Sequence, residues 1–291
     1  MTSQWKTKTA MTNAKRYATD ENQPSGGAEE LEKILLSNPD DSMTWVRLMA
    51  VHLHGGGVGR ARAVAEKAIA SINFRLEGQL LNVWSALFNL ENLYGCDVTM
   101  DKTIERALKQ NDQLKIYQRL AKIYVTSGKR EKAEEIFEKM TKKFRLNKSV
   151  WIAHMRHLME DNRHKEAQDV MKRSILSLPK KQHMEVISRL GQLEFQLGEA
   201  ERGRTLFEGL IDVCPKRTDI WGIYLDCSAK SGRVDETRQI FRRVTSLSLS
   251  SKKMKNLFKR FVEFELEFGN DETVRNVKQQ AMNYVESQTM M

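Results

Sequence analysis

A pattern that returns every 33 to 39 residues leaves this sequence few possible folds. Each copy has a large apolar residue, followed eleven positions later by a residue that tolerates a left-handed turn, usually glycine. The apolar anchors are Trp45, Trp84, Tyr117, Trp151, Ile187, Trp221 and Phe258. The residues eleven positions later are Gly56, Gly95, Gly128, Asn162, Gly198, Gly232 and Gly269. Self-similarity at this period indicates an array of helical hairpins, in which each repeat buries its apolar face only by stacking on its neighbours.

The composition agrees with a helical chain that buries a large core. The 291 residues are 40% hydrophobic and 30% charged, with only 4 prolines and a mean hydropathy of -0.55. No uninterrupted apolar run approaches the roughly 18 residues that a membrane-spanning helix needs. The three cysteines have no CxxC spacing, and His154 and His157 have no third ligand nearby in sequence. Packing roles are therefore favoured for these residues over metal binding.

The chain divides into a short lead-in, a long periodic region and a tail. Residues 1–27 lack apolar periodicity and are rich in Thr, Ser and Asn, which predicts a disordered basic lead-in. No apolar stretch typical of a secretory signal follows its lysines. Residues 28–287 are predicted to form the repeat array, and residues 288–291 a disordered tail.

Local signals predict where the helices begin and end. Residues 28–37 carry an apolar stripe that ends before Pro39, which indicates the second helix of an incomplete first repeat. Each later repeat is expected to have a helix A with the anchor, a turn and a helix B. The glycine eleven residues after the anchor is expected to supply a positive φ that ends helix A. Pro179 and Pro215 each lie 28 residues after an anchor and should end helix B. The fold class expected is all-α, a right-handed α-solenoid of about seven repeats plus the incomplete first one.

A recurrent glutamate narrows the type of repeat. Glu91, Glu194 and Glu265 each lie seven residues after an anchor. Together with the composition of the B helices, this pattern resembles the half-a-TPR (HAT) variant of the tetratricopeptide repeat, which is found mainly in proteins of RNA-processing complexes. The tryptophan anchors are expected to be core residues of the array and not to line a ligand site.

Longer strings resemble one family more specifically. They are Leu81-Asn82-Val83-Trp84, Asn89-Leu90-Glu91-Asn92-Leu93-Tyr94-Gly95, Gln192-Leu193-Glu194-Phe195-Gln196-Leu197-Gly198, Pro215-Lys216-Arg217-Thr218-Asp219-Ile220-Trp221 and Phe258-Lys259-Arg260. From about residue 29 to about 286 the chain resembles the C-terminal repeat domain of the ribosomal RNA processing protein 5 family, large nucleolar scaffolds of early pre-ribosomes. The resemblance implies a role in pre-ribosomal RNA processing, with the helical array organising the small-subunit precursor.

One part of that family's pattern is missing from this sequence. The resemblance implies a long N-terminal series of RNA-binding OB-fold repeats, and none is present here. Two explanations stay open: the sequence is a piece of a longer protein, or it is a stand-alone array whose contact with RNA is weaker or indirect.

Net charge points to an acidic partner. The chain carries a formal charge of +10 and has a pI of about 9.4, which favours encounter with nucleic acid or acidic proteins. Basic pairs are expected just past the ends of B helices, where stacked turns would form a ridge that could follow a phosphate backbone. The alternative is that these lysines only offset helix dipoles and stay solvated. The candidate residues are Lys142, Lys143, Arg145, Lys148, Lys180, Lys181, Lys216, Arg217, Lys252, Lys253 and Lys255, which Lys259 and Arg260 extend.

No catalytic motif, cofactor site or metal site is visible. The run Gly55–Gly59 lacks the Lys-Ser/Thr of a phosphate-binding loop. The sequence therefore predicts a non-catalytic scaffold in ribosomal RNA processing and small-subunit biogenesis, located in the nucleus and nucleolus. Its expected partners are pre-ribosomal assembly proteins, pre-ribosomal RNA or both, with no membrane and no small-molecule substrate.

Three alternatives stay open. A HAT scaffold of pre-mRNA processing would share the repeat but not the longer strings. A general TPR-type peptide-binding adaptor would present its basic residues from A helices. The last alternative is self-association through an apolar face of the terminal helix, formed by Val274, Val277, Lys278, Ala281 and Val285.

Overall fold

The computed structural model describes residues 27–289, and side chains as far as residue 287. These residues form fifteen α-helices and no strand, as expected for an all-α solenoid. The expected lead-in lies outside the described residues except for Gly27, and the last helix continues to Thr289, two residues beyond the expected end of the array. The helices are α2 (Ala28–Ser37), α3 (Ser42–His54), α4 (Val58–Ser71), α5 (Glu77–Tyr94), α6 (Asp97–Gln110), α7 (Gln113–Thr126), α8 (Arg130–Lys143), α9 (Lys148–Glu160), α10 (His164–Ser177), α11 (Lys180–Leu197), α12 (Ala200–Val213), α13 (Thr218–Lys230), α14 (Val234–Thr245), α15 (Ser251–Phe268) and α16 (Asp271–Thr289).

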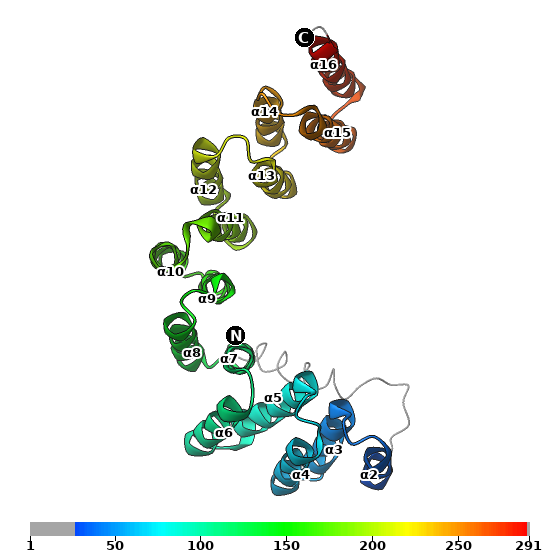
Figure 1. Ribbon diagram of the computed structural model, residues 1–291, viewed down its shortest axis with the longest axis vertical. Helices are drawn as coiled ribbons and strands as arrows, with labels where there is room; N and C mark the ends of the chain where they lie inside the picture. Colours follow the sequence, from blue (N-terminus) through cyan, green and yellow to red (C-terminus); the bar gives the residue numbers. More distant parts are fainter. Residues whose placement is uncertain (1–26, 290–291) are drawn as a thin grey trace, which may run out of the picture. The chain divides into compact units, whose positions relative to one another are not determined.

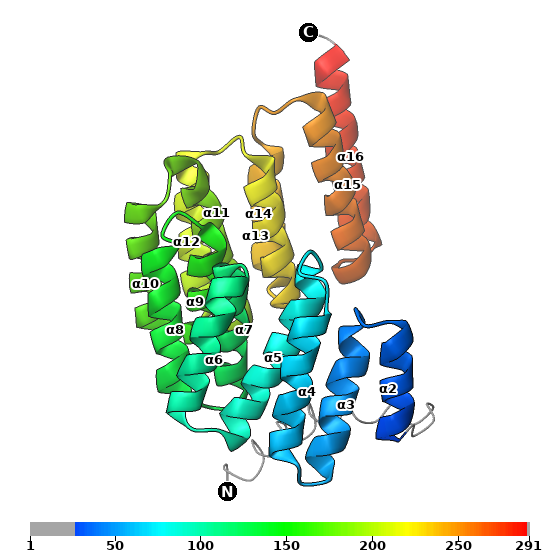
Figure 2. The same cartoon turned by 60° about the horizontal axis from the view of Figure 1, so that its bottom comes forward.

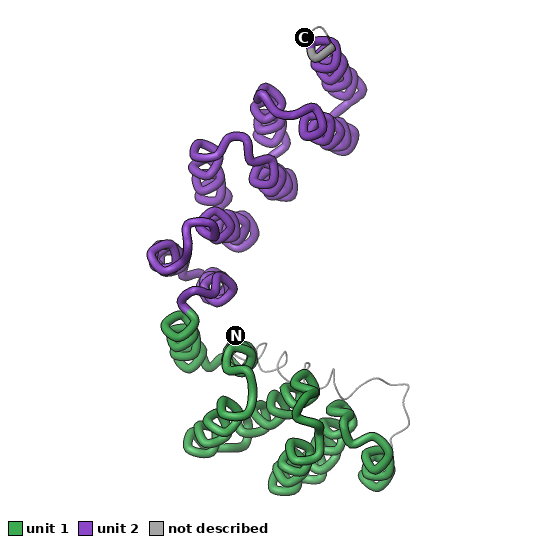
Figure 3. The backbone as a smooth tube through the Cα atoms, in the orientation of Figure 1, with its two compact units in different colours: residues 1–144 green, residues 145–291 purple. Residues whose placement is uncertain are grey.

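The helices form two compact units, residues 1–144 and 145–291 (Figure 3). Within each unit, consecutive helices pair as antiparallel A–B hairpins such as α3–α4 and α9–α10 (Figures 1 and 2). Most A helices also pack against a neighbouring A helix, as α5 does against α7 and α11 against α13. Each unit is therefore a stack of hairpins with its A helices in one layer and its B helices in another. None of the described helices is long and apolar enough to cross a membrane.

Most of the anchors form the core between the two layers. Trp45, Trp84, Trp151, Trp221 and Phe258 are at most 7% exposed. Tyr117 and Ile187 are only half-buried, and in their repeats the preceding residue is fully buried instead. One residue corresponds to about 100° of rotation around a helix, so these two A helices turn a different residue toward the core. The residues sixteen positions after the anchors are all buried, and five of them are Ala, Gly or Thr, which allows close approach of helices A and B. They are Ala61, Met100, Ala133, Ala167, Gly203, Thr237 and Val274.

The turn between helices A and B has two forms. Gly56, Gly128, Gly232 and Asn162 have φ between 61° and 75°, as expected for a left-handed residue that ends helix A. In these repeats helix A has 13 or 14 residues.

In the other three repeats the expectation of a positive φ is wrong. Gly95, Gly198 and Gly269 have φ of -94°, -122° and -108°, and each follows an A helix of 18 residues. Glycine is required here for a different reason. A Cβ at residue 95 or 269 would lie 2.7 Å from the carbonyl oxygen four residues earlier and against the glutamate side chain of that same residue. Glycine thus leaves room for a buried carboxylate.

The tryptophan anchors also differ between short and long A helices. The indole Nε1–H groups of Trp45, Trp151 and Trp221 donate to a carbonyl oxygen six residues earlier, at 2.8 to 2.9 Å. Those carbonyls lie in the turns before the 13-residue A helices. Six residues before Trp84 the chain is already inside α5, and the buried Nε1–H of Trp84 has no hydrogen-bond partner among the described residues. A longer helix A therefore lacks the turn carbonyl that accepts the indole N–H in the shorter repeats.

Candidate functional site

The predicted basic residues lie at several kinds of position. Lys142 and Lys143 are exposed in the last turn of α8, and the Lys143 ammonium lies 5.9 Å from the centre of the Tyr117 ring. Arg145 is exposed in the turn before α9. Lys148, the first residue of α9, is bound to Glu185 at 2.6 Å. Arg217 is bound to Asp219 in a similar way. The charges of Lys148 and Arg217 are therefore already paired with acidic residues of this chain.

The structure places the other pairs at the start of A helices. Lys180 and Lys181 are the first two residues of α11, and Lys252, Lys253 and Lys255 lie in the first turns of α15. Pro179 caps α11, so the lysines that follow it begin helix A and do not end helix B. A helix N-terminus carries a partial positive charge that disfavours cations by about 0.3–1 kcal/mol each. These five lysines therefore do not offset a helix dipole.

Seven exposed cations of the second compact unit lie along one edge. Because its hairpins are antiparallel, its A helices run in the same direction, and the pair Lys148–Glu185 joins the N-terminal parts of two of them. Their N-termini therefore share one edge, on which the turns α12–α13 and α14–α15 lie together (Figure 2). We define the basic edge as the exposed cations there that make no ion pair with a described acidic residue. It consists of Arg145, Lys180, Lys181, Lys216, Lys252, Lys253 and Lys255.

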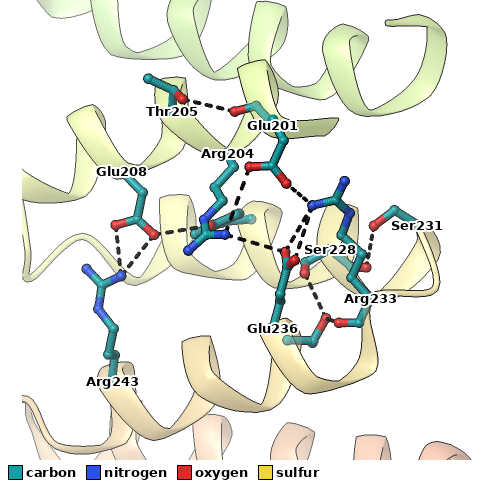
Figure 4. Close-up of polar contacts among 11 residues, drawn as sticks. Glu201, Arg204, Thr205, Glu208, Ser228, Ser231, Arg233, Glu236 and Arg243 are labelled. Atoms are coloured by element: carbon teal, nitrogen blue, oxygen red, sulfur yellow. Dashed lines mark hydrogen bonds and ion pairs between the residues drawn. The ribbon is translucent and has the colours of Figure 1, made fainter. Parts of the chain in front are cut away.

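The B helices α12 and α14 are different because their charges pair with one another. Figure 4 shows the polar contacts between α12 and α14. Arg243 donates to both carboxylate oxygens of Glu208, at 2.8 and 2.9 Å, and Arg233 binds both Glu201 and Glu236. These ion pairs link neighbouring hairpins, so their arginines are not available to a partner.

Tyr224 lies beneath this network. Its hydroxyl donates to Glu208 at 3.1 Å, and Tyr224 itself is 1% exposed. Burial and the adjacent carboxylate raise the pKa of Tyr224 well above its ordinary value. The tyrosine is thus a neutral hydrogen-bond donor that orients Glu208 toward Arg243.

A second kind of polar site lies at the C-terminal ends of the long A helices. Glu91 is 5% exposed and accepts from Arg62 Nε at 2.6 Å and from Arg62 Nη2 at 3.1 Å, as well as from the Thr99 hydroxyl at 2.8 Å. Glu265 is 1% exposed and accepts from Arg238 Nε at 2.7 Å and Nη2 at 3.0 Å. We call each of these arrangements a carboxylate clamp: a glutamate of helix A held by an arginine of the preceding helix B.

The clamps keep both carboxylates ionised. Burial alone would raise the pKa of the Glu91 carboxyl, but the hydrogen bonds from Arg62 and Thr99 outweigh it and hold the pKa below its ordinary value. The same balance, with Arg238 and Thr273 as donors, lowers the pKa of Glu265. A bidentate arginine is the strongest such donor, because both of its N–H groups match the carboxylate. Each clamp therefore joins two successive hairpins.

Glu194 occupies the same place in the Ile187 repeat but has no clamp. It is 0% exposed, and neither carboxylate oxygen has a hydrogen-bond partner among the described residues. His164 Nδ1 lies 3.9 Å from Glu194 Oε2, which is too far for a hydrogen bond. The sequence marked Glu91, Glu194 and Glu265 as repeat residues but did not predict which of them are paired. The missed signal is the arginine directly after the small residue of helix B, present in Ala61-Arg62 and Thr237-Arg238 but not in Ala167-Gln168.

Metal-binding geometry is not found in the described part of the chain, where no group of three or more His, Cys, Asp or Glu residues could hold an ion. His154 and His157 are buried in α9, 2% and 5% exposed.

Comparison with known proteins identifies the family. A sequence model of the family described as U3 small nucleolar RNA-associated protein 6 C-terminal matches residues 97–281, more than half of the chain. The chain belongs to this family. It is also similar to the "Protein RRP5 homolog" of Homo sapiens and of Mus musculus, with 41% identity to each over 262 residues. Identity to the "rRNA biogenesis protein RRP5" of Arabidopsis thaliana is 40% over 262 residues. The resemblance to the ribosomal RNA processing protein 5 family is therefore confirmed.

The match covers most of this chain but little of those relatives. It spans 89 to 90% of this chain and 14% of the length of each of the three relatives. Among solved structures, a chain of the Naa15/Naa10 complex bound to HypK-THB aligns at 18% identity and a TM-score of 0.38, over 94% of this chain and 44% of that chain. That similarity is too low to support a conclusion about function.

Proposed function

We propose that this chain is a non-catalytic scaffold in ribosomal RNA processing and small ribosomal subunit biogenesis, acting in the nucleolus. The observation that carries the proposal is its membership of a family described by U3 small nucleolar RNA association, together with about 40% identity to RRP5 proteins over most of the chain. A stack of helical hairpins supports this role because it offers long contact surfaces for partners.

We further propose that the basic edge contacts the phosphate backbone of pre-ribosomal RNA. Its seven cations are exposed and make no ion pair with a described acid, and five of them lie at helix N-termini, where cations are locally unfavourable. A local cost of this kind is offset when the cations bind an anion. Few aromatic side chains accompany them, so binding is expected to depend on charge more than on base identity.

Two matched triple variants test the RNA contact. K181E/K216E/K253E reverses three cations of the basic edge, whereas K165E/K230E/K278E reverses three exposed lysines of the same compact unit outside that edge. Fluorescence anisotropy with a labelled pre-ribosomal RNA fragment would measure affinity across a salt series. The edge variant should bind at least tenfold more weakly and lower the salt slope by about 2, since each single-strand phosphate contact contributes roughly 0.7. Equal losses in both variants would contradict a specific role of the edge.

The cellular role has its own test. The tagged protein would be purified from nuclear extract with and without RNase, and co-purifying RNA and proteins identified. Recovery of pre-ribosomal RNA and small-subunit assembly factors is expected. Recovery of splicing components or chaperones alone would replace the ribosomal role with a pre-mRNA scaffold or a peptide-binding adaptor.

A further inference from the structure

We propose that Glu194 is a receptor for an arginine side chain presented by a partner protein. Glu194 and the basic edge are separate sites with different ligands. Glu194 lies fourteen residues along α11 from Lys180 of the basic edge, about 21 Å at the α-helical rise of about 1.5 Å per residue. A buried carboxylate repels phosphate, so RNA is not its ligand.

The chemistry of the ligand follows from the other two repeats. Glu91, Glu194 and Glu265 share one position in the repeat, four residues before a glycine that a Cβ would force against the carboxylate. At Glu91 and Glu265 a guanidinium occupies the remaining side with two N–H donors. The same backbone geometry thus binds arginine twice within this chain. A guanidinium is therefore the group that we expect the carboxylate of the third site to bind.

No described residue of this chain supplies that guanidinium to Glu194. Gln168 stands where Arg62 and Arg238 stand in the other repeats, and Arg202 replaces the threonine. Arg202 is bound to Glu199 and Arg163 to Glu166, so both of these arginines already have carboxylate partners. A buried carboxyl group that makes no hydrogen bond destabilises the folded state. A donor from outside the described chain would remove this cost, which is a driving force for binding.

The site is covered thinly. Gly198 is exposed, and a Cβ at this residue would overlap Glu194 Oε2 and lie 3.2 Å from His164 Nδ1. His164 lies beside this glycine; its side chain is 21% exposed, and its Nδ1 lies 3.3 Å from Met159 Sδ. Thioether sulfur is a weak acceptor, so moving the imidazole away from it breaks only a weak contact. An arginine can therefore reach Glu194 once the imidazole of His164 moves aside, because the exposed glycine adds no side chain in its way.

The first experiment uses a small guanidinium probe on the full chain. N-ethylguanidinium should raise the Tm of the wild-type protein by about 2 °C at a concentration about tenfold above its Kd, and N-ethylammonium should raise it less. The rise should disappear in E194Q, which cannot form the charged pair, and in Q168R, which supplies the guanidinium internally. R62A is the positive control, because it leaves Glu91 in the same condition and its lost stability should be partly restored by the same compound.

The second experiment looks for the partner side chain. A photo-crosslinking residue placed at Leu197, which is 40% exposed beside Gly198, would be activated in nuclear extract. The crosslinked peptide should contain an arginine, and its yield should fall at least tenfold in the E194Q and Q168R backgrounds. RNA affinity should be unchanged in both, which separates this site from the basic edge.

Three results would overturn the inference. The first is a wild-type protein that does not respond to N-ethylguanidinium although R62A is rescued. The second is a response that persists in E194Q. The third is a crosslink that does not depend on Glu194.

Discussion

The hairpins α15–α16 and α11–α12 share the same helix length and turn, but only the first has a paired buried glutamate. Both have an 18-residue helix A, and both have a buried glutamate four residues before a glycine with negative φ. In the first, Arg238 holds Glu265 with two hydrogen bonds, whereas in the second Glu194 has no hydrogen-bond partner among the described residues. The difference comes from the preceding helix B, in which one residue is arginine in α14 and glutamine in α10.

A repeat of this array does not determine its own stability. In a stacked array the energy is divided between the hairpins and the contacts between neighbours. Here the cost of burying a charge arises in one hairpin, and the group that offsets it belongs to the preceding one. The Ile187 repeat buries a glutamate that no arginine of the preceding hairpin binds. An external hydrogen-bond donor would therefore stabilise this repeat most.

The largest effect is expected when the arginine of an intact clamp is removed. R238M leaves Glu265 buried without its donor and should lower the free energy of unfolding by about 3 kcal/mol, the usual cost of breaking a buried pair. The urea midpoint and hydrogen exchange in α15–α16 would measure it. The matched control is Q168M, which changes the equivalent residue of α10 and should cost less than about 0.5 kcal/mol, as is usual for substitutions that remove no such contact. Equal losses of unfolding free energy in the two variants would mean that the hydrogen bonds of the clamp do not stabilise the protein.

Glycine substitutions separate the two kinds of turn. G269A should displace Glu265 and cost about 2–3 kcal/mol, because the added Cβ meets a backbone carbonyl and the buried carboxylate. G128A meets no atom within 4 Å but forces alanine to a φ of 74°, which costs about 1 kcal/mol. Thermal unfolding would measure both. G128N serves as a control and should be milder than G128A, since Asn162 already adopts a φ of 61° at the same place in its own repeat.

Neutral glutamine should have opposite effects at the two kinds of glutamate. E91Q weakens the pair with Arg62 and should cost about 1–2 kcal/mol. E194Q replaces a buried carboxyl group that has no described hydrogen-bond partner and should stabilise the protein by about 1 kcal/mol. Urea midpoints of the two variants would show the sign directly. Destabilisation by E194Q as large as that by E91Q would indicate that Glu194 is already paired in solution.

Acid should weaken the intact clamp. The pKa of Glu265 is lowered on folding, so its ionised form stabilises the folded state above its ordinary pKa of 4.5. That contribution is lost as the pH falls from this value through the lower pKa of the folded state. Urea midpoints measured between about pH 6 and pH 3 should therefore fall less steeply for E265Q than for the wild type. Identical slopes would show that Glu265 does not titrate in this range.

The smallest effect concerns the tryptophan indole groups. W221F removes the hydrogen bond to the Pro215 carbonyl, whereas W84F removes an N–H that has no described acceptor. Both lose similar apolar volume, so W221F should cost about 1 kcal/mol more than W84F, the value of one hydrogen bond. Thermal unfolding of the pair would measure the difference. A larger loss in W84F would point to an acceptor for its indole in solution.

Much of the architecture could be predicted because it depends on local and periodic signals. The helix expected at residues 28–37 is α2, and Pro179 and Pro215 each follow the end of a B helix by two residues. Four of the seven turns have the expected left-handed residue. The lysines after Pro179 and those at the start of α15 were harder to place, because a basic pair between two helices can end the first or begin the second.

The repeat, its helical period and its family are properties of the sequence alone, since they depend on which residue types return at fixed spacing. Which glutamates are neutralised became clear only from the folded chain. Arg62 and Glu91 are 29 residues apart, and Arg238 and Glu265 are 27 apart, on helices of different hairpins. Whether such residues meet depends on how neighbouring hairpins pack, and that packing is cooperative across the stack. Three glutamates at one repeat position therefore differ in their pairing, because the arginine that binds two of them belongs to the preceding hairpin.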